Sequence, residues 1–459
     1  MALENYASAL SDQLIPNLDF KSGPGSSYIL DRRNISIYPQ GSNIYSNATG
    51  TRVVRISVQA DQSWIDPSSA YLYFRVVNND TTAQNSSQIT RCEPLGQAHV
   101  FFKSARLLLQ GQVAEDLQDF GRTFEQLLRL SDPQYQKQYA GMSFGIRDHD
   151  PENMSDLRQI RRIPPGGSKT VAMPLSIFGL FSQHRFLPAA FCNMVLEFTV
   201  QDPSLVCRGG TSTTGGVTTT YNSNISMDSF VLKLDSIILD SQLQESYNSM
   251  LLTRTIPLSY KTLISTSYAQ TGNSNDVSIT FSRALSRLCT VWISFFSVSG
   301  DPNLKKEVNY FPHVEGGLDS LSQTDHPLFS DDVVQDSKAI SVEMTINGER
   351  FPTSPAMYTT EQFVRAILSL GYSGQTSHSL GIAGPYYETE DFQIIENFEK
   401  HIGTELSGKS LRGGSQLLVH LKNLVKSGMP DHDKITKIFL LAQASMIAEI
   451  SAQGVTILE

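Results

Sequence analysis

Apolar and polar residues alternate with period two along several short runs of this chain. Two such runs, Thr51–Val58 and Ala70–Val77, lie on either side of a turn predicted at Asp66–Ser69. This alternation is typical of strands that bury one face. Further strands are predicted at 169–175, 194–200, 229–240, 276–281, 288–296, 415–421 and 435–450. Short strands at this spacing, separated by turn signals, are typical of a β-sandwich.

Two distant segments show the same order of predicted elements. Ser104–Glu115 holds an apolar run, Gly111 and a second strand, and an amphipathic helix is predicted directly afterwards over 121–130. Ser341–Pro352 repeats this order around Gly348, ahead of a helix predicted over 359–370. The two glycines are therefore interpreted as equivalent turns. Further structural turns are predicted at two Pro- and Gly-rich sites, which comprise Pro164, Pro165, Gly166 and Gly167, and Gly413 and Gly414.

Length supports the duplication. A chain of 459 residues exceeds what one hydrophobic core usually serves, so two domains are expected. We predict a mainly β protein of two tandem sandwiches, with short helices in the connections between strands. The predicted divisions are an N-terminal arm at 1–28, a first sandwich at 29–250 and a second at 251–459. Two long segments, 207–224 and 300–338, are too polar for core elements, and we expect both to be exposed loops.

Composition excludes several classes of function. The formal net charge is −9 and only 18% of residues are charged, which argues against a basic face for binding nucleic acid directly. The N-terminus lacks a basic, apolar leader and no run approaches a membrane span, so we expect a soluble, non-secreted chain. Four scattered cysteines without a C-x-x-C pair favour buried thiols in a reducing compartment over a disulfide framework or a zinc site. No cofactor or metal is predicted.

One segment of the chain matches a motif that is known from enzymes. Gly403–Ser410 matches the phosphate-binding loop G-x-x-x-x-G-K-[ST] of nucleotide hydrolases. That chemistry needs a helix after the loop, whereas Arg412–Gly414 would break a helix and 415–421 alternates as a strand. A glycine-rich turn is the favoured interpretation. The pairs His149–Asp150 and His432–Asp433 and the carboxylates Glu388 and Glu390 fit solvated turns, so no catalytic residue is predicted.

The order and duplication of these elements resemble the major capsid proteins of the double-jelly-roll viral lineage, especially those of Polinton-like viruses, adintoviruses and virophages. The resemblance runs from about residue 28 to the C-terminus. The segments that carry it are Ile37–Gly41, Val53–Val58, Trp64–Phe74, Leu109–Gln112, Phe181–Pro188, Asn193–Phe198 and Ile346–Pro352.

This resemblance implies a non-enzymatic structural protein whose homotrimers form pseudo-hexameric capsomers that tile an icosahedral shell. Its partners would then be further copies of itself and, in addition, penton and minor capsid proteins. The protein would be found in the virion after assembly inside the host cell. Two alternatives stay open: a two-domain β-sandwich that binds carbohydrate or processes glycans, and a minor capsid or penton protein. Stable trimers would favour the capsomer, and glycan binding by a monomer would favour the first alternative.

Overall fold

Strands dominate the architecture of this protein. The computed structural model describes the residues 29–41, 44–46, 52–58, 63–145, 162–183, 185–189, 191–214, 216–270, 274, 276–297, 311, 338–371, 381–382, 387, 391–400, 407–422, 424 and 435–458. Within these ranges, no sheet combines strands from before and after residue 255.

The sandwich of the first half is built, within the described residues, from two antiparallel sheets of five and four strands. One has the order β1 (Ile29–Ile37), β12 (Ile225–Leu239), β4 (Trp64–Asn78) and β8 (Ser168–Pro174), with the short β2 (Ile44–Ser46) also paired to β12. The other has the order β3 (Val53–Val58), β9 (Met194–Val200), β6 (Phe102–Leu109) and β7 (Gln112–Leu117).

The second half contains a matching pair of sheets. One has the order β13 (Ile256–Ala269), β20 (Ile435–Ser451), β15 (Leu288–Ser297) and β18 (Ile394–Asn397), with β21 (Gly454–Leu458) also paired to β20. The other has the order β14 (Val277–Phe281), β19 (Leu417–Lys422), β16 (Lys338–Ile346) and β17 (Glu349–Tyr358).

Both halves have the same topology. When the eight main strands of each half are numbered along the chain, the two sheets read 1-8-3-6 and 2-7-4-5 in both cases. The fifth strand is followed by a helix in both halves, α2 (Phe120–Leu130) in the first and α7 (Thr359–Ser369) in the second. Eight strands that interleave between two sheets in this way form a jelly roll. The predicted fold class, two tandem β-sandwiches with short helices in the connections, is confirmed.

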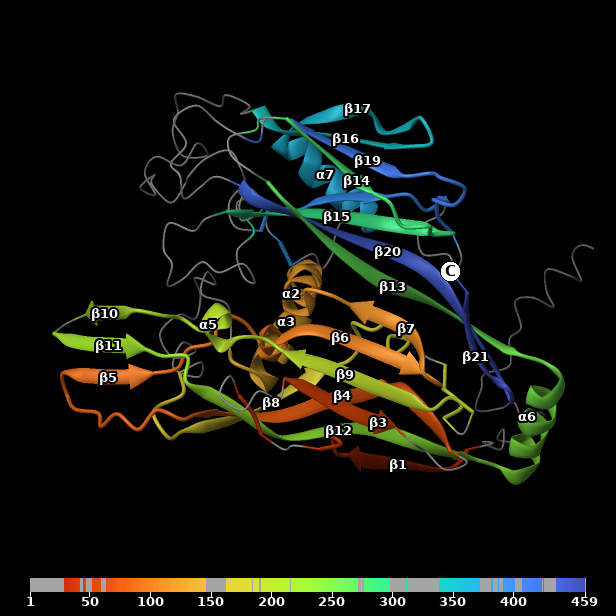
Figure 1. Ribbon diagram of the computed structural model, residues 1–459, viewed down its shortest axis with the longest axis horizontal. Coiled ribbons are helices and arrows are strands. Elements are labelled where there is room, and N and C mark those ends of the chain that lie inside the picture. Colours follow the sequence, from red (N-terminus) through yellow and green to blue (C-terminus); the bar gives the residue numbers. More distant parts are fainter. Residues whose placement is uncertain are drawn as a thin grey trace, which may run out of the picture.

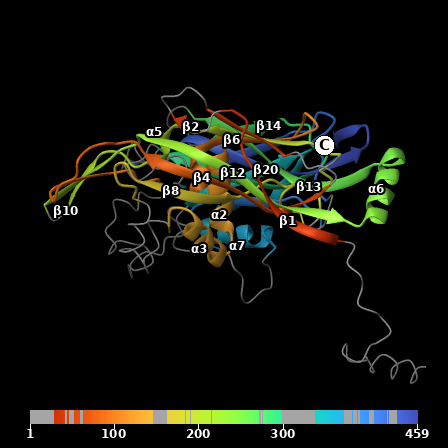
Figure 2. The ribbon, with the colours of Figure 1, turned by 90° about the horizontal axis from the view of Figure 1, so that it is seen from below.

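Each sandwich forms because alternate strand residues face inward. In β9, for example, every second residue from Met194 to Val200 is buried, which is the period of two that a half-buried strand requires. The buried apolar side chains of both halves join into one cluster among the described residues. Figure 1 shows the two sandwiches stacked with α2 between them, and Figure 2 shows α2, α3 (Pro133–Met142) and α7 on the same side of the sheets.

The turn predicted at Asp66–Ser69 is wrong, because β4 continues through these residues. The Asp66 carboxylate accepts hydrogen bonds from the Ser68 backbone N–H (3.1 Å) and hydroxyl (2.6 Å). The pairing register with β12 shifts beside this segment. The turn-forming residues therefore make a local irregularity inside one strand, which tertiary pairing with β12 holds in place.

The predicted loop at 207–224 is also wrong. After the short helix α5 (Pro203–Val206), β10 (Thr211–Thr214) and β11 (Val217–Tyr221) form a hairpin, and β11 pairs in parallel with β5 (Gln88–Arg91). Threonine is β-branched and fits a pleated surface, so a Thr-rich segment can form strands without joining a core. We call this three-stranded sheet the blade; Figure 1 shows it projecting from one end of the first sandwich.

Two shorter elements complete the framework. The 3-10 helix η2 (Ala98–Phe101) leads into β6, and α6 (Ser241–Thr253) joins β12 to β13. The domain boundary expected near residue 250 falls within α6. The predicted arm at 1–28 lies outside the described residues, as does the predicted insertion at 300–338 apart from Phe311 and Lys338.

Candidate functional site at the junction of the two sandwiches

The two glycines of the sequence duplication occupy equivalent hairpins. Gly111 has a φ of 81° and follows Gln110 at 50°, between β6 and β7. Gly348 has a φ of 81° and follows Asn347 at 53°, between β16 and β17. Positive φ at both central residues is the requirement of the type I′ hairpin turn, in which glycine is favoured.

The other predicted turn residues lie at two further places in the fold. Pro164, Pro165, Gly166 and Gly167 precede β8, and the Gly167 N–H donates to the Pro164 carbonyl at 2.9 Å. Gly413 and Gly414, with φ values of 73° and 88°, precede β19. The structure therefore leaves the eight predicted residues at separate turns and does not gather them into one site.

The phosphate-loop motif has a structural explanation in its described part. Lys409 pairs with Leu288 in a β-bridge, and its ammonium lies 2.6 Å from the Glu349 carboxylate. A Cβ on Gly408 would lie 2.6 Å from the Leu288 carbonyl oxygen, so the glycine is required for close backbone approach. The next element is strand β19, as predicted, and residues 403–406 lie outside the described part of the chain.

The remaining polar candidates are two His-Asp pairs and one pair of glutamates. Residues 149, 150, 388, 390, 432 and 433 all lie outside the described residues. Among the residues that are described, no group of three or more His, Cys, Asp or Glu side chains is placed to hold a metal ion. The described helices include none that is long and apolar enough to cross a membrane.

Among the described residues, many buried polar contacts lie at the junction between the two sandwiches, and the central element of this junction is α2. This helix is amphipathic in sequence, yet its polar residues Arg122, Gln126 and Arg129 are buried as fully as its apolar ones. Residues spaced four and three apart share one side of a helix. Because partners of these residues lie in the second half, we identify this side of α2 as the contact surface between the sandwiches.

Arg129 is the centre of a buried ionic cluster. Its Nε lies 3.1 Å from the Glu125 carboxylate, and its Nη1 pairs with Asp391, just before β18 of the second half. Glu125 also lies 3.0 Å from Nε2 of His99, whose Nδ1 is 3.2 Å from the Tyr139 hydroxyl. Burial raises the pKa of Tyr139 well above its usual value, so this hydroxyl remains protonated.

Arg122 makes a second buried connection. Its Nη2 donates to the Phe295 carbonyl at 2.9 Å and to the Ser294 hydroxyl at 3.2 Å. Its guanidinium also lies over two aromatic rings, 4.3 Å from the centre of Phe296 and 3.5 Å from that of Phe311. A planar guanidinium suits this position because it can donate in its plane and stack on its faces.

Glu115 of β7 is the centre of a third set of buried hydrogen bonds. Its carboxylate accepts the Gly179 N–H at 2.8 Å and the Leu180 N–H at 2.9 Å, and it also bonds the hydroxyl of Thr262 in β13. Burial raises the pKa of Glu115 to about 7, although these three donors oppose the shift. Nearby, the Tyr260 hydroxyl donates to the Ala114 carbonyl at 3.0 Å. Strand β13 is thus hydrogen-bonded to the first sandwich along β7.

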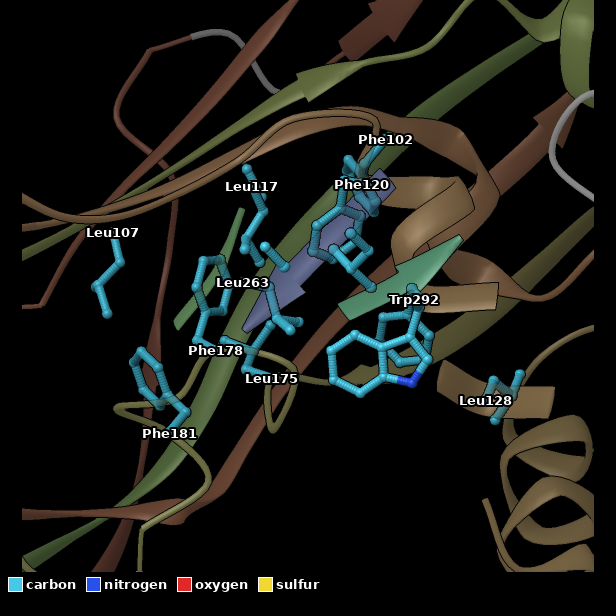
Figure 3. Close-up of a cluster of buried hydrophobic side chains, with 14 of the residues drawn as sticks. Phe102, Leu107, Leu117, Phe120, Leu128, Leu175, Phe178, Phe181, Leu263 and Trp292 are labelled. Atoms are coloured by element: carbon cyan, nitrogen blue, oxygen red, sulfur yellow. The ribbon is translucent and has the colours of Figure 1, made fainter. Parts of the chain in front are cut away.

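Apolar packing fills the rest of the junction. In Figure 3, Leu263 of β13 and Trp292 of β15 lie among side chains of the first sandwich, including Leu117, Phe120 and Phe178. A cavity of about 400 Å³ opens beside this packing, and the residues lining it come from both halves. The two sandwiches are therefore joined by a continuous core, with charged groups that are paired inside it.

The sequence could not reveal this junction directly. Arg122, Glu125 and Arg129 occupy a helix whose polar face suggested exposure to solvent, and Asp391 lies in a segment without a pattern. One signal was available: Glu125 and Arg129 are spaced as an i,i+4 ion pair. That spacing does not distinguish a surface pair from a buried one, because burial depends on the second sandwich.

The fold of this chain is similar to those of several solved structures. PBCV-1 VP54, fitted into a reconstruction of the virophage Sputnik, aligns with a TM-score of 0.60 at 14% identity, covering 95% of this chain and 99% of that chain. The Faustovirus major capsid protein aligns with a TM-score of 0.58 at 10% sequence identity, and the alignment covers 96% of this chain and 94% of that chain. The 3.5 Å structure of the Sputnik virophage aligns with a TM-score of 0.56 at 11% sequence identity, and the alignment covers 97% of this chain and 92% of that chain.

Sequence comparison adds nothing to this similarity. No protein-family model matches the chain, and no curated protein matches it significantly. The similarity to the solved structures nevertheless extends over both sandwiches, since it covers nearly all of each chain. The chain therefore has the double-jelly-roll fold, and its structural neighbours are viral major capsid proteins.

Proposed function

We propose that this chain is a viral major capsid protein, whose homotrimers form pseudo-hexameric capsomers that tile an icosahedral shell. The observation that carries the proposal is the repeated strand order, 1-8-3-6 and 2-7-4-5, in two sandwiches fused through a buried junction. The similarity to capsid proteins over nearly the whole chain supports it.

The geometry suits a shell. Each chain presents two sandwiches of similar outline, so three chains around a closed threefold axis present six and can fill one position of a hexagonal lattice. Such a lattice needs a fixed angle between the two sandwiches of each chain. The ion pairs of Arg129, the hydrogen bonds of Arg122 and the packing around Leu263 support such a fixed angle, because a packed interior resists continuous deformation.

The proposal includes the division of the chain and its partners. We assign 29–250 to the first jelly roll, 251–459 to the second and 1–28 to an arm. Neighbouring capsomers, penton proteins and minor capsid proteins would be the partners, without direct nucleic-acid binding, which agrees with the net charge of −9. The blade, projecting from one end of the first sandwich, would decorate the capsomer. Assembly would take place inside the host cell, in a reducing compartment, and the chain would act in the virion without enzymatic activity.

The solution mass of the purified protein tests this function. Light scattering should give three times 50.8 kDa, and electron microscopy of the same fraction should show pseudo-hexagonal particles or shells. Measurements at low and high salt separate specific trimers from charge-driven association. A monomer under all conditions would contradict the proposal. In that case a glycan-binding screen would test the carbohydrate-binding or glycan-processing alternative.

A further inference from the structure

Two cysteines that are distant in sequence meet at the base of the blade. The sulfur atoms of Cys92 and Cys207 are 3.7 Å apart, although 115 positions separate the residues in the chain. Both thiols are buried, and neither forms a disulfide in this structure. At this distance the two sulfurs are in van der Waals contact, so no other atom lies between them.

The local backbone fixes this approach. Cys92 directly follows β5, and Cys207 ends α5 ahead of β10. Their segments run antiparallel, with Pro94 and Cys207 paired in a β-bridge. The Arg208 N–H donates to the Glu93 carbonyl at 2.8 Å on one side of this bridge. The two cysteines are therefore diagonal neighbours across two short backbone segments, each held at the root of a different strand of the blade.

We propose that Cys92 and Cys207 are a modification site, at which oxidation forms a disulfide that clamps the base of the blade. A disulfide needs the sulfurs to approach to about 2.05 Å. Rotation about the two Cα–Cβ bonds supplies part of that movement. The rest comes from the backbone, because diagonal neighbours have Cα atoms roughly 7–8 Å apart and disulfides usually need roughly 4.4–6.8 Å. That movement has to come from the isolated β-bridges that hold the two cysteines, Pro94 with Cys207 and Cys92 with Ile163.

The chemistry is a thiol–disulfide exchange with a low-molecular-weight disulfide such as oxidised glutathione. One cysteine thiolate attacks glutathione disulfide, which releases one glutathione and leaves a mixed disulfide. The second cysteine thiolate then attacks the protein sulfur of that mixed disulfide and releases the other glutathione. The cysteine sulfurs lose two electrons and glutathione gains them. Each proton lost by a cysteine is matched by one taken up by a released glutathione thiolate.

The other two cysteines provide an internal control. Cys192 and Cys289 are also buried, so burial alone does not distinguish them from the pair. Cys289 has the Ser445 hydroxyl as its neighbour at 3.1 Å. Proximity of two sulfurs therefore selects Cys92 and Cys207.

The bond would matter most after release from the cell, a point that rests on the proposed shell function. A shell protein made in a reducing compartment keeps its thiols until the particle reaches oxidising surroundings. The disulfide would then close a loop that includes β6, β7, β8 and β9, half of the eight main strands of the first sandwich. Such a closure constrains the unfolded chain and should raise the unfolding temperature by about 5 °C.

The test compares the full-length protein in reduced and oxidised form. Reduced protein is unfolded and refolded in a glutathione redox buffer, so that access to the buried thiols does not limit the reaction. Peptide mapping should then show the Cys92–Cys207 disulfide in preference to any other pairing of the four cysteines. Oxidised wild-type protein should unfold at higher temperature than reduced protein, and the reductant should reverse this difference.

Variants separate the bond from a packing effect. Cys92→Ser and Cys207→Ala should each abolish both the bond and the temperature difference, whereas Cys192→Ala should retain both. Free Cys92 and Cys207 peptides after oxidative refolding, or a different pairing, would overturn the proposal. Peptide mapping needs no variant to fold and no trimer to form. Its outcome is therefore independent of the solution mass that tests the shell function.

Discussion

The buried carboxylate of Glu115 predicts that the stability of this protein falls as pH rises toward 7. The side chain is 2% exposed, and it connects β7 to the Gly179–Leu180 backbone and to Thr262 of the second sandwich. Burial disfavours the charged form more than the three hydrogen bonds favour it. The folded protein therefore holds a proton on Glu115 at pH values where the unfolded chain has already released it.

The direction and size of this pH effect follow from the pKa of Glu115 in the unfolded chain and in the folded protein. The pKa rises from 4.5 in the unfolded chain to about 7 in the folded protein. Between these values the folded state binds more protons, so the stabilising contribution is complete below pH 4.5 and is lost as pH rises through about 7. Each unit of pKa difference corresponds to about 1.4 kcal/mol, so roughly 2.5 kcal/mol of unfolding free energy should be lost between pH 5 and pH 8.

Urea unfolding of wild-type protein and of the variant Glu115→Gln measures this effect. Tryptophan fluorescence is a suitable signal, because Trp292 lies in the junction. The glutamine cannot ionise, although its NH₂ group faces a backbone donor and lowers stability at every pH. The difference between the two proteins should therefore change with pH by roughly 2.5 kcal/mol from pH 5 to pH 8. Glu245→Gln, at an exposed position of α6, controls for loss of one negative charge.

A constant difference between wild type and Glu115→Gln from pH 5 to pH 8 would refute the reasoning. It would mean that Glu115 is ionised throughout this range, so that the hydrogen bonds outweigh burial. A pH-dependent difference of the same size for Glu245→Gln would also refute it, because the effect would then belong to net charge rather than to the junction.

Two further predictions concern the same junction. A Cβ on Gly179 would overlap the carbonyl oxygen of Lys261 and lie 2.7 Å from its carbonyl carbon. Gly179→Ala should lower the unfolding free energy by about 3 kcal/mol in urea titrations, whereas Gly141→Ala, which meets nothing within 4 Å, should not destabilise α3. Asp391→Ala removes one buried partner of Arg129 and should lower the unfolding free energy by about 3 kcal/mol. The double variant Asp391→Ala, Arg129→Met should lose less unfolding free energy than the sum of the two single losses; a loss equal to that sum would contradict the pairing.

Local patterns were sufficient to predict much of the fold. The alternation along β3 and β9 and the periodicity of α2 and α7 each depend on which side of an element is apolar, and that information is present in the sequence. The glycine turns at Gly111 and Gly348 were also predictable as turns, because few residues adopt positive φ easily.

Predictions failed where tertiary pairing overrode local preference. Asp66–Ser69 has the composition of a turn, yet pairing with β12 both before and after this segment keeps β4 continuous. The Thr-rich segment of β10 and β11 lacks an apolar face, and it forms strands because β5 offers a partner. In both cases the deciding hydrogen bonds join residues far apart in the chain.

The sequence by itself determined the class of fold and its duplication, because strand periodicity, helix amphipathicity and hairpin glycines are local properties that recur in both halves. Only the tertiary structure decided how the halves are joined and which polar groups are buried. Arg129 and Asp391 are 262 positions apart, and Cys92 and Cys207 are 115 apart. Their meeting depends on the packing of whole sheets, and burial then sets the energies of their charges and thiols.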